Sequence, residues 1–401
     1  MKPETLLSSS ISNGAAAESS SRGIRAVPPG VPRRSFLRRL GMGAVLLSPA
    51  AALLTSTSRA EEDGSDIESE SGLTKGDAAL LRFAAAAEIL ETDLWVQYNE
   101  LAGIQDSEVP GGSGNPAYTE ALKVLDEDMD QYIHDNTEDE FTHFTFLNAY
   151  LVSKGAKPVH LDQFRTLPGS TATGSSGKPR LTNLMQLTLD TSWYTRYRIH
   201  RNPDLNPDFK FPQAIPSLFT GEHTAIPRTD NDVNHPKFLQ AIANTAGFHF
   251  PTIEQGGNSL YPAMAQRATS VEVLRILISI GPTETMHFQT WQDKAGNAPP
   301  LTAVDPVTGV SVTFPDLNSP PFGGEEFQTN LIMPEPCRFL SQDLPLCSVI
   351  RPTNTNGIAA AVVKFLADMG LFRGQSQAFF AFLNQLAAEA DAARRGAQDG
   401  D

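Results

Sequence analysis

Two short segments of the chain each place a glutamate and a histidine three residues apart. Residues 139–144 read DEFTHF and residues 284–291 read ETMHFQTW. Side chains three apart lie on one face of a helix, one turn from each other. The two pairs are Glu140 with His143 and Glu284 with His287. A single pair of this kind is usually an ordinary hydrogen-bonded pair in a core, but two pairs call for a shared explanation.

Both pairs interrupt apolar stripes with helical spacing. The spacing predicts helices over about 77–102, 117–153 and 262–295. The stripes on the last two of these helices run Leu122, Leu125, Met129, Tyr132, Asn136, Glu140, His143, Leu147 and Val273, Leu277, Ile280, Glu284, His287, Trp291. On the first helix Glu91 lies on the stripe and Glu88 lies one turn earlier. A buried carboxylate costs several kcal/mol unless it is paired, protonated or bound to a metal. Together these residues indicate a carboxylate-bridged two-metal centre inside a helical bundle, with oxygen and imidazole ligands that suit iron or manganese.

The first sixty residues carry the features of an export signal. Residues 33–38 read RRSFLR, an apolar run of fifteen residues follows at 40–54, and Ser58 and Ala60 supply small residues for cleavage after Ala60. This pattern resembles a twin-arginine signal, which implies export of the folded protein by the twin-arginine machinery and a periplasmic or secreted location. The run is shorter than the roughly 20 residues of a membrane span, so we expect none in the mature form. The alternative is a disordered basic tail beside a short anchor.

Charge is distributed unevenly along the 401 residues. The chain has a net charge of −15, but its first sixty residues contain eight basic and two acidic residues. The remainder has 23 basic and 44 acidic residues, and it begins with a predicted flexible acidic leader at 61–74. The acidic residues after position 60 would repel the phosphates of nucleic acids, so no nucleic-acid partner is expected.

Three segments carry a family resemblance. Residues 91–98 (ETDLWVQY) resemble the first bundle helix of ferritin-like proteins, where a ligand glutamate precedes Gln-Tyr. Residues 139–144 and 284–291 resemble the second-helix and fourth-helix motifs, in which a ligand histidine follows a ligand glutamate by one turn. With the export signal and the long loops, the chain is most similar to the exported ferritin-like proteins grouped with desiccation-related proteins.

The resemblance implies a mainly α fold, a ferritin-like four-helix bundle with long Pro-rich inserted loops and extra C-terminal helices. We predict the bundle over 75–295, with an insertion at 201–258 that contains no long helix. Residues 296–401 are predicted to form Pro-rich loops, a hairpin near 307–312 and C-terminal helices packed on the bundle. A length of 401 residues with 40% hydrophobic content is ample for such a core.

The resemblance also implies roles for the candidate ligands. Glu91, Glu140 and Glu284 would bind or bridge two ions of iron or manganese, and His143 and His287 would each complete one ion, with Glu88 as a further candidate. The carboxylate from the third helix is not evident. The candidate is Asp190, on a stripe of a helix predicted over 181–200, although it could equally pair with Arg196 or Arg198. Glu272 lies twelve residues before Glu284, about 18 Å along a helix, and is expected to pair with an arginine instead.

Two further features have open alternatives. Pro282 would cost about 3 kcal/mol inside a helix, so the helix either ends there or bends. We favour a bend, because the stripe from Val273 to Trp291 stays in phase across the proline. Cys337 and Cys347 form either a disulfide, as an oxidising compartment permits, or two independent buried thiols.

Two functions follow from this interpretation. The leading hypothesis is an exported ferritin-like protein with a dinuclear iron or manganese site, active in redox chemistry or metal handling under stress. If it is an enzyme, it would be a di-metal oxidoreductase. The alternative is a non-catalytic stress-related or envelope-binding protein that has kept the bundle without the metal.

Overall fold

The computed structural model describes residues 73–109, 111–196, 211–323, 334–335, 341, 343–348 and 356–396. All of them belong to the unit Ala60–Asp401. The predicted export signal, the leader as far as residue 72, Arg198 and Cys337 lie outside the described residues.

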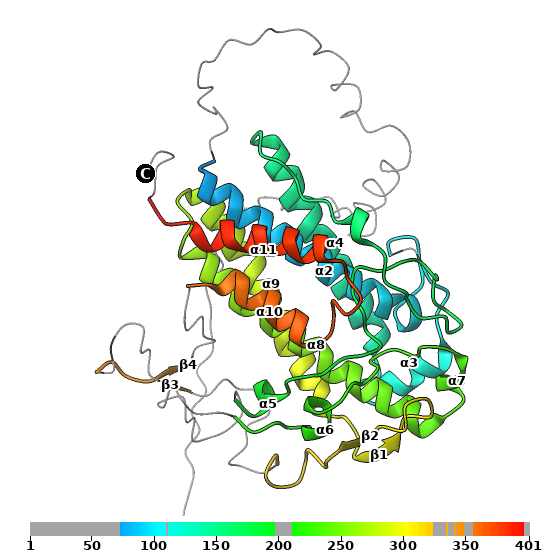
Figure 1. The fold of residues 1–401 in the computed structure, drawn as a ribbon. Coiled ribbons are helices and arrows are strands. Elements are labelled where there is room, and N and C mark those ends of the chain that lie inside the picture. Colours follow the sequence, from blue (N-terminus) through cyan, green and yellow to red (C-terminus); the bar gives the residue numbers. More distant parts are fainter. Residues whose placement is uncertain are drawn as a thin grey trace, which may run out of the picture. The chain divides into compact units, whose positions relative to one another are not determined.

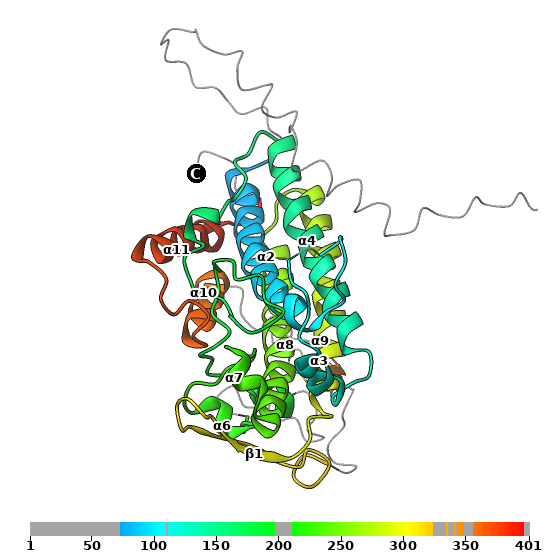
Figure 2. The same cartoon turned by 90° about the vertical axis from the view of Figure 1, so that its right-hand side faces the viewer.

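Four long helices form a bundle: α2 (Lys75–Ala102), α4 (Met129–Ser153), α8 (Pro236–Ala265) and α9 (Val271–Ala295) (Figure 1). Helix α2 packs along α4, and α8 packs along α9 (Figure 2). The predicted mainly α bundle is confirmed. No described helix is both long enough and apolar enough to cross a membrane.

Side-chain caps mark where two of these helices, α2 and α9, begin. Thr74 precedes α2 and accepts a hydrogen bond from the amide of Asp77. Ser270 precedes α9 and accepts from the amides of Glu272 and Val273. Such caps satisfy amides that have no partner within the helix, and each stabilises its helix by about 1 kcal/mol.

The helix predicted over 117–153 is divided into two. Helix α3 (Pro116–Lys123) starts with Asn115 as its cap and Pro116 in its first turn, and α4 begins only at Met129. Between them the side chain of Asp126 accepts from the amide of Asp128. Aspartate side chains that bond to nearby backbone in this way compete with the helix, which accounts for the break.

Residues 201–258 were expected to contain no long helix, and that expectation is wrong. Helix α8 begins at Pro236 and continues to Ala265 with Pro251 and Pro262 inside it. Its residues from 238 to 254 are buried almost without interruption, so no single apolar stripe is visible in the sequence. The helix predicted over 262–295 therefore combines the last turn of α8 with α9.

Helix α9 runs unbroken through Gly281 and Pro282, as the phase of its stripe predicts. A Cβ atom at Gly281 would lie 2.7 Å from the Cβ of Tyr261 on α8. Glycine at this position therefore permits the close approach of the two helices.

The helix predicted over 181–200 is almost entirely absent among the residues described. Only α5 (Ser192–Arg196) is helical, and Leu187 instead forms an isolated β-bridge with His223. The amides of Leu181 and Thr182 donate to the side chain of Asp93 on α2, so these amides are bonded to another segment and not within a helix. Two other short helices, α6 (Pro216–Phe219) and α7 (Asp230–Val233), lie in the same connection.

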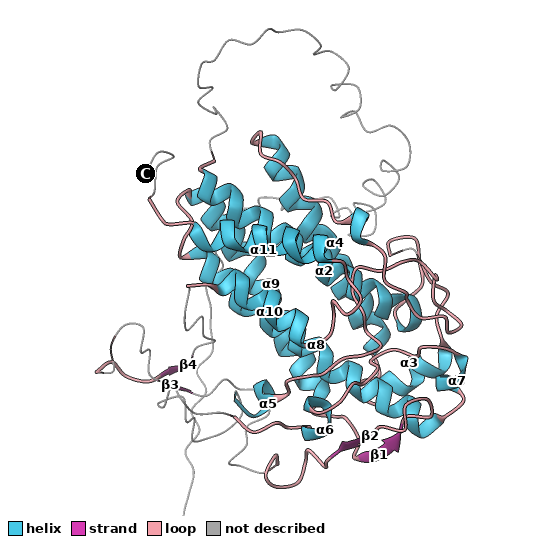
Figure 3. Cartoon of the chain, viewed as in Figure 1, coloured by secondary structure: helices cyan, strands magenta, loops and turns pink. Residues whose placement is uncertain are grey.

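Within the described residues the strands form two small antiparallel pairs (Figure 3). Strand β1 (Leu301–Val304) pairs antiparallel with β2 (Ser311–Phe314), so the hairpin predicted near 307–312 is present. Strands β3 (Pro334–Glu335) and β4 (Cys347–Ser348) form the second.

Two C-terminal helices complete the described chain: α10 (Ile358–Asp368) and α11 (Gln377–Ala392). Helix α11 packs on α2, and α10 packs on α8 and α11. The side chain of Arg82 on α2 forms an ion pair with Glu389 at 3.0 Å. The two helices therefore cover the side of the bundle formed by α2 and α8.

Candidate metal centre

Six side chains from the four long helices converge in the bundle. They are Glu88 on α2, Glu140 and His143 on α4, Glu254 on α8, and Glu284 and His287 on α9. They form two overlapping groups, Glu88/Glu140/His143/Glu284 and Glu140/Glu254/Glu284/His287, and in each group the potential ligand atoms all lie within 4.8 Å of one another. Glu140 and Glu284 belong to both groups. This is the arrangement that two ions bridged by two carboxylates require.

Both imidazoles present Nδ1 to the carboxylates. Nδ1 of His143 lies 3.2 Å from Glu88 Oε2, 3.1 Å from Glu140 Oε2 and 3.4 Å from Glu284 Oε1. Nδ1 of His287 lies 3.2 Å from Glu140 Oε1 and 3.3 Å from Glu254 Oε2. Nδ1 of His143 thus faces three carboxylates and Nδ1 of His287 faces two, and Glu140 is common to both histidines.

Several atoms of this cluster lack a hydrogen bond. The four glutamates are at most 1% exposed. Among the described residues, both carboxylate oxygens of Glu284, Oε2 of Glu254 and Nδ1 of His287 form no hydrogen bond of acceptable geometry, although some of these atoms form the ion-pair contacts given above. Buried polar atoms are nearly always partnered, and these unpartnered atoms face one another. The donor set therefore fits a pair of divalent cations such as iron or manganese.

Burial and mutual repulsion shift the pKa values within the cluster. Burial raises the pKa of Glu88 to about 7, although the charge of His143 opposes the rise. Burial and the charge of Glu140 raise the pKa of Glu284 well above its usual value. Burial would lower the pKa of His143, but the neighbouring Glu88 and Glu140 raise it well above the ordinary value. Without metal the cluster therefore retains protons, which a cation would displace.

The second ring nitrogen of each histidine contacts the residue that precedes, on the opposite helix, one of the two glutamates shared by both groups. Nε2 of His143 lies 3.1 Å from Oγ1 of Thr283, and Nε2 of His287 lies 3.2 Å from Oδ2 of Asp139. Such partners orient a metal-binding imidazole and set which of its nitrogens carries the proton.

An outer polar framework orients the carboxylates. Nε1 of Trp95 donates to Glu254 Oε1 at 3.1 Å. The side-chain amide of Asn136 donates to Glu140 at 3.0 Å and to Glu254 at 3.1 Å. Trp291 in turn donates to Asn136 at 2.7 Å, and its ring stacks on Trp95. Both tryptophans thus combine core packing with support of the site.

Residues 76–296 match the family model of the ferritin-like domain, which is more than half of the chain. This chain belongs to the ferritin-like domain family. Comparison with curated proteins and with solved structures gives no match. The matched region of the ferritin-like domain contains the four long helices except Lys75, the first residue of α2, and ends before the β1–β2 hairpin.

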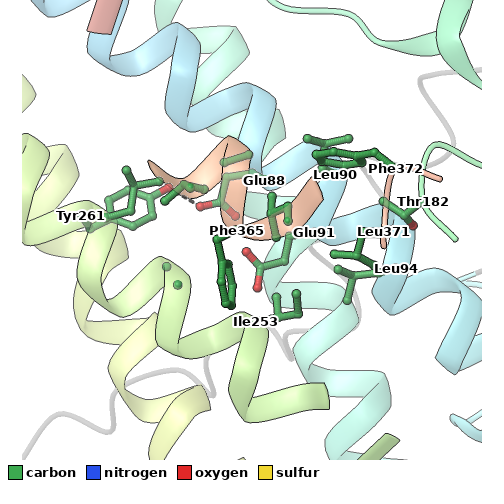
Figure 4. Close-up of a pocket in the computed structure, with 16 residues that line it drawn as sticks. Glu88, Leu90, Glu91, Leu94, Thr182, Ile253, Tyr261, Phe365, Leu371 and Phe372 are labelled. Carbon is green, nitrogen blue, oxygen red and sulfur yellow. Dashed lines mark hydrogen bonds between the residues drawn. The ribbon is translucent and has the colours of Figure 1, made fainter. Parts of the chain in front are cut away.

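On α2 of the ferritin-like domain, Glu88 occupies the place that was expected for Glu91. Glu91 lies one turn further along, is buried, and lines a small cavity together with Glu88 (Figure 4). Burial raises its pKa well above the usual value, and the charge of Glu254 adds to the effect. Because nearly all of α2 is buried, the apolar stripe does not distinguish the two glutamates.

Asp190 lies outside the cluster. It is exposed and accepts hydrogen bonds from the amide of Ser192 at 2.9 Å and from the side chain of Gln213 at 2.8 Å. The helix that would have carried it inward does not form. Glu272 is also outside the cluster, and it pairs with Lys154 at 2.7 Å instead of an arginine.

Glu254 on α8 supplies the carboxylate that sequence analysis did not find. The sequence around it reads FHFPTIEQGG, a single acid in an otherwise apolar stretch that ends in two glycines. An isolated acid among aromatic and aliphatic residues was the available signal. Proline and glycine disfavour the interior of a helix, so Pro251 and the two glycines led the sequence analysis to predict no helix around Glu254.

Substitutions of the two residues behind the histidines should weaken metal binding without removing a ligand. Asp139→Ala and Thr283→Val are each expected to lower affinity about 10- to 100-fold, because the imidazole loses its orientation. Competition with a chromophoric chelator measures the metal affinity of each variant. Ser279→Ala, an exposed position on α9 whose hydroxyl bonds only to backbone, is the matched control. Unchanged affinity in both variants would show that the rings are positioned by packing alone.

Proposed function

We propose that the ferritin-like domain binds two ions of iron or manganese and uses them in redox reaction with dioxygen or peroxide, or in metal handling. The observation that carries the proposal is the pair of overlapping ligand groups that share Glu140 and Glu284. When bound, such ions supply redox equivalents and Lewis acidity.

The chain's residues have distinct tasks in this proposal. Glu140 and Glu284 would bridge the two ions. Glu88 and His143 would complete the coordination of one ion, and Glu254 and His287 would complete that of the other. The donor set of carboxylates and imidazoles, with no thiolate among the grouped residues, favours iron or manganese over soft metals.

We also propose that the protein is exported in a folded state and acts in the periplasm or outside the cell. The RRSFLR segment and the small residues before position 61 support this. Export of a folded protein suits a bundle that acquires its metal in the cytoplasm. A role under stress, as in the desiccation-related proteins that the chain resembles, is part of the same proposal.

Elemental analysis tests the proposal most directly. Protein exported with its own signal is expected to contain about two iron or manganese ions per chain, as in other di-metal bundles. The double variant Glu140→Ala/His143→Ala should contain none, because a bridging ligand and a terminal ligand are lost. Glu272→Ala, which removes only an exposed ion pair, is the control. Metal-free wild-type protein would refute the proposal and favour a non-catalytic binding protein.

A further inference from the structure

A second cluster of acidic side chains surrounds a buried histidine of α4. Its members come from α4 and from the loop that follows α2. They are His134, Asp135 and Glu138 on α4, and Asp106 and Glu108 in the loop; we call these five residues the outer cluster. His134 belongs to two groups, one with Asp106 and Glu108 and the other with Asp135 and Glu138. In each group the potential ligand atoms lie within 4.8 Å of one another.

The outer cluster is separate from the candidate metal centre. None of its members belongs to the two ligand groups of that centre. His134 precedes Glu140 by six residues, which places it about 9 Å away along the helix axis and about 120° around it. Asp106 and Asp135 are exposed, whereas the glutamates of the centre are buried. The outer cluster is therefore open to solvent independently of the centre.

His134 lacks the partner that a buried imidazole normally has. The residue is only 4% exposed. Among the described residues its Nδ1 has no hydrogen-bond partner, and its Nε2 lies 3.7 Å from Asp106 Oδ2, beyond hydrogen-bonding distance. Oε1 of Glu138 is also buried without a partner in that part of the chain. Buried polar atoms are nearly always partnered, so these atoms indicate a ligand that binds between them.

The acids of the outer cluster lack a permanent positive charge. The negative charges of Glu108, Asp135 and Asp106 all act on Glu138, so the two groups are contiguous. Within the described residues, no lysine or arginine forms an ion pair with these four acids, and the contact of Asp106 is with His134. Like charges at such short range repel one another, and a cation placed among them would remove this repulsion.

The loop already holds its acids beside α4. Oδ1 of Asp106 accepts hydrogen bonds from the amides of Glu108 at 2.8 Å and Val109 at 3.3 Å, which leaves Oδ2 facing His134. The amide of Ile104 donates to the carbonyl of Asp130 near the start of α4 at 3.3 Å. A ligand set that is positioned before the ion arrives binds more tightly, because less ordering is needed on binding.

The types of donor in the outer cluster indicate the class of ion. Calcium and magnesium take oxygen ligands, whereas an imidazole together with carboxylates suits manganese, iron or zinc. We propose that the outer cluster binds one divalent transition-metal cation, which links the loop after α2 to α4. The site does not depend on the proposed function, because it shares no residue with the central ligand groups. Its exposed acids let the ion exchange with solvent, so isolated protein keeps only the central ions until more is added.

Manganese titration tests this site with the central ligands removed. Protein exported with its own signal and carrying Glu140→Ala/His143→Ala is the parent, and free Mn²⁺ is measured by electron paramagnetic resonance. His134→Gln or Asp106→Asn is then added to the parent. Asparagine at 106 can still accept from the two loop amides, so this variant serves if His134→Gln does not fold. Glu127→Gln, which neutralises an exposed acid outside the cluster, is the matched control.

We expect one Mn²⁺ per chain in the parent and in the control. Affinity should fall at least about tenfold in His134→Gln and in Asp106→Asn, because loss of a ligand costs at least as much as loss of its outer partner. Hydrogen exchange of residues 103–109 should slow when Mn²⁺ binds to the parent.

Three results would overturn the inference: no bound Mn²⁺ in the parent, equal affinity in the cluster variants and the control, or unchanged exchange of the loop when Mn²⁺ is bound. Failure of the proposed function is distinguishable from these results. It appears as absent metal in isolated wild-type protein, and the titration of the parent remains interpretable because the parent already lacks the central site.

Discussion

Glu284→Ala is expected to lose both metal ions, whereas Glu254→Ala loses only one. Glu284 belongs to both ligand groups and would bridge the two ions, so its removal leaves neither ion with enough ligands. Glu254 belongs to one group only, the one that contains His287. The ion held by Glu88 and His143 should therefore remain in Glu254→Ala.

Metal content per chain, measured after dialysis against a weak chelator, checks this stepwise loss. Asp190→Ala is the control, because Asp190 is an exposed acid outside the cluster. It should retain the metal content of the wild type. Loss of metal from Asp190→Ala, with none from Glu254→Ala, would mean that α8 does not supply the fourth carboxylate.

The metal-free protein is expected to lose stability as the pH rises from about 5 to 8. Burial raises the pKa of Glu88 from 4.5 to about 7 and that of Glu284 well above 4.5. Between the unfolded and folded pKa values the folded state holds more protons than the unfolded state, so the free energy of unfolding falls as pH increases. Each proton contributes about 1.4 kcal/mol per pH unit.

Bound metal should reverse this trend. Metal replaces the protons of the cluster, and its affinity increases as the ligands deprotonate. The stabilisation by metal, which reaches about 4 kcal/mol at a thousand times the dissociation constant, should therefore grow with pH.

Urea unfolding at several pH values measures how the free energy of unfolding changes with pH, in the metal-free protein with chelator and in the metal-bound protein with manganese. Glu284→Gln removes one titrating group of nearly the same shape and should flatten the slope of the metal-free protein. An equal slope in this variant and the wild type would show that Glu284 does not carry the effect.

The Glu-x-x-His pairs follow from local sequence alone. In any helix a residue three positions on lies on the same face, so Glu140 with His143 and Glu284 with His287 point together whatever surrounds them. Local sequence also predicts that α9 is unbroken, because its apolar stripe keeps the same phase before and after Pro282. These features required no knowledge of how the helices pack.

The remaining ligands depend on packing between distant segments. Both Glu88 and Glu91 are buried on α2, and only the position of α4 and α9 decides that Glu88 faces the cluster. Helix α8 forms across Pro251 because the bundle encloses it, and this brings Glu254 inward. Asp190 stays outside because its segment is non-helical, with the amide of Leu181 bonded to Asp93 on α2 and the amide of Thr191 bonded to Gln213. Helical spacing in the sequence specifies which face of a helix a residue occupies. The packing of the helices specifies which other residues that face contacts.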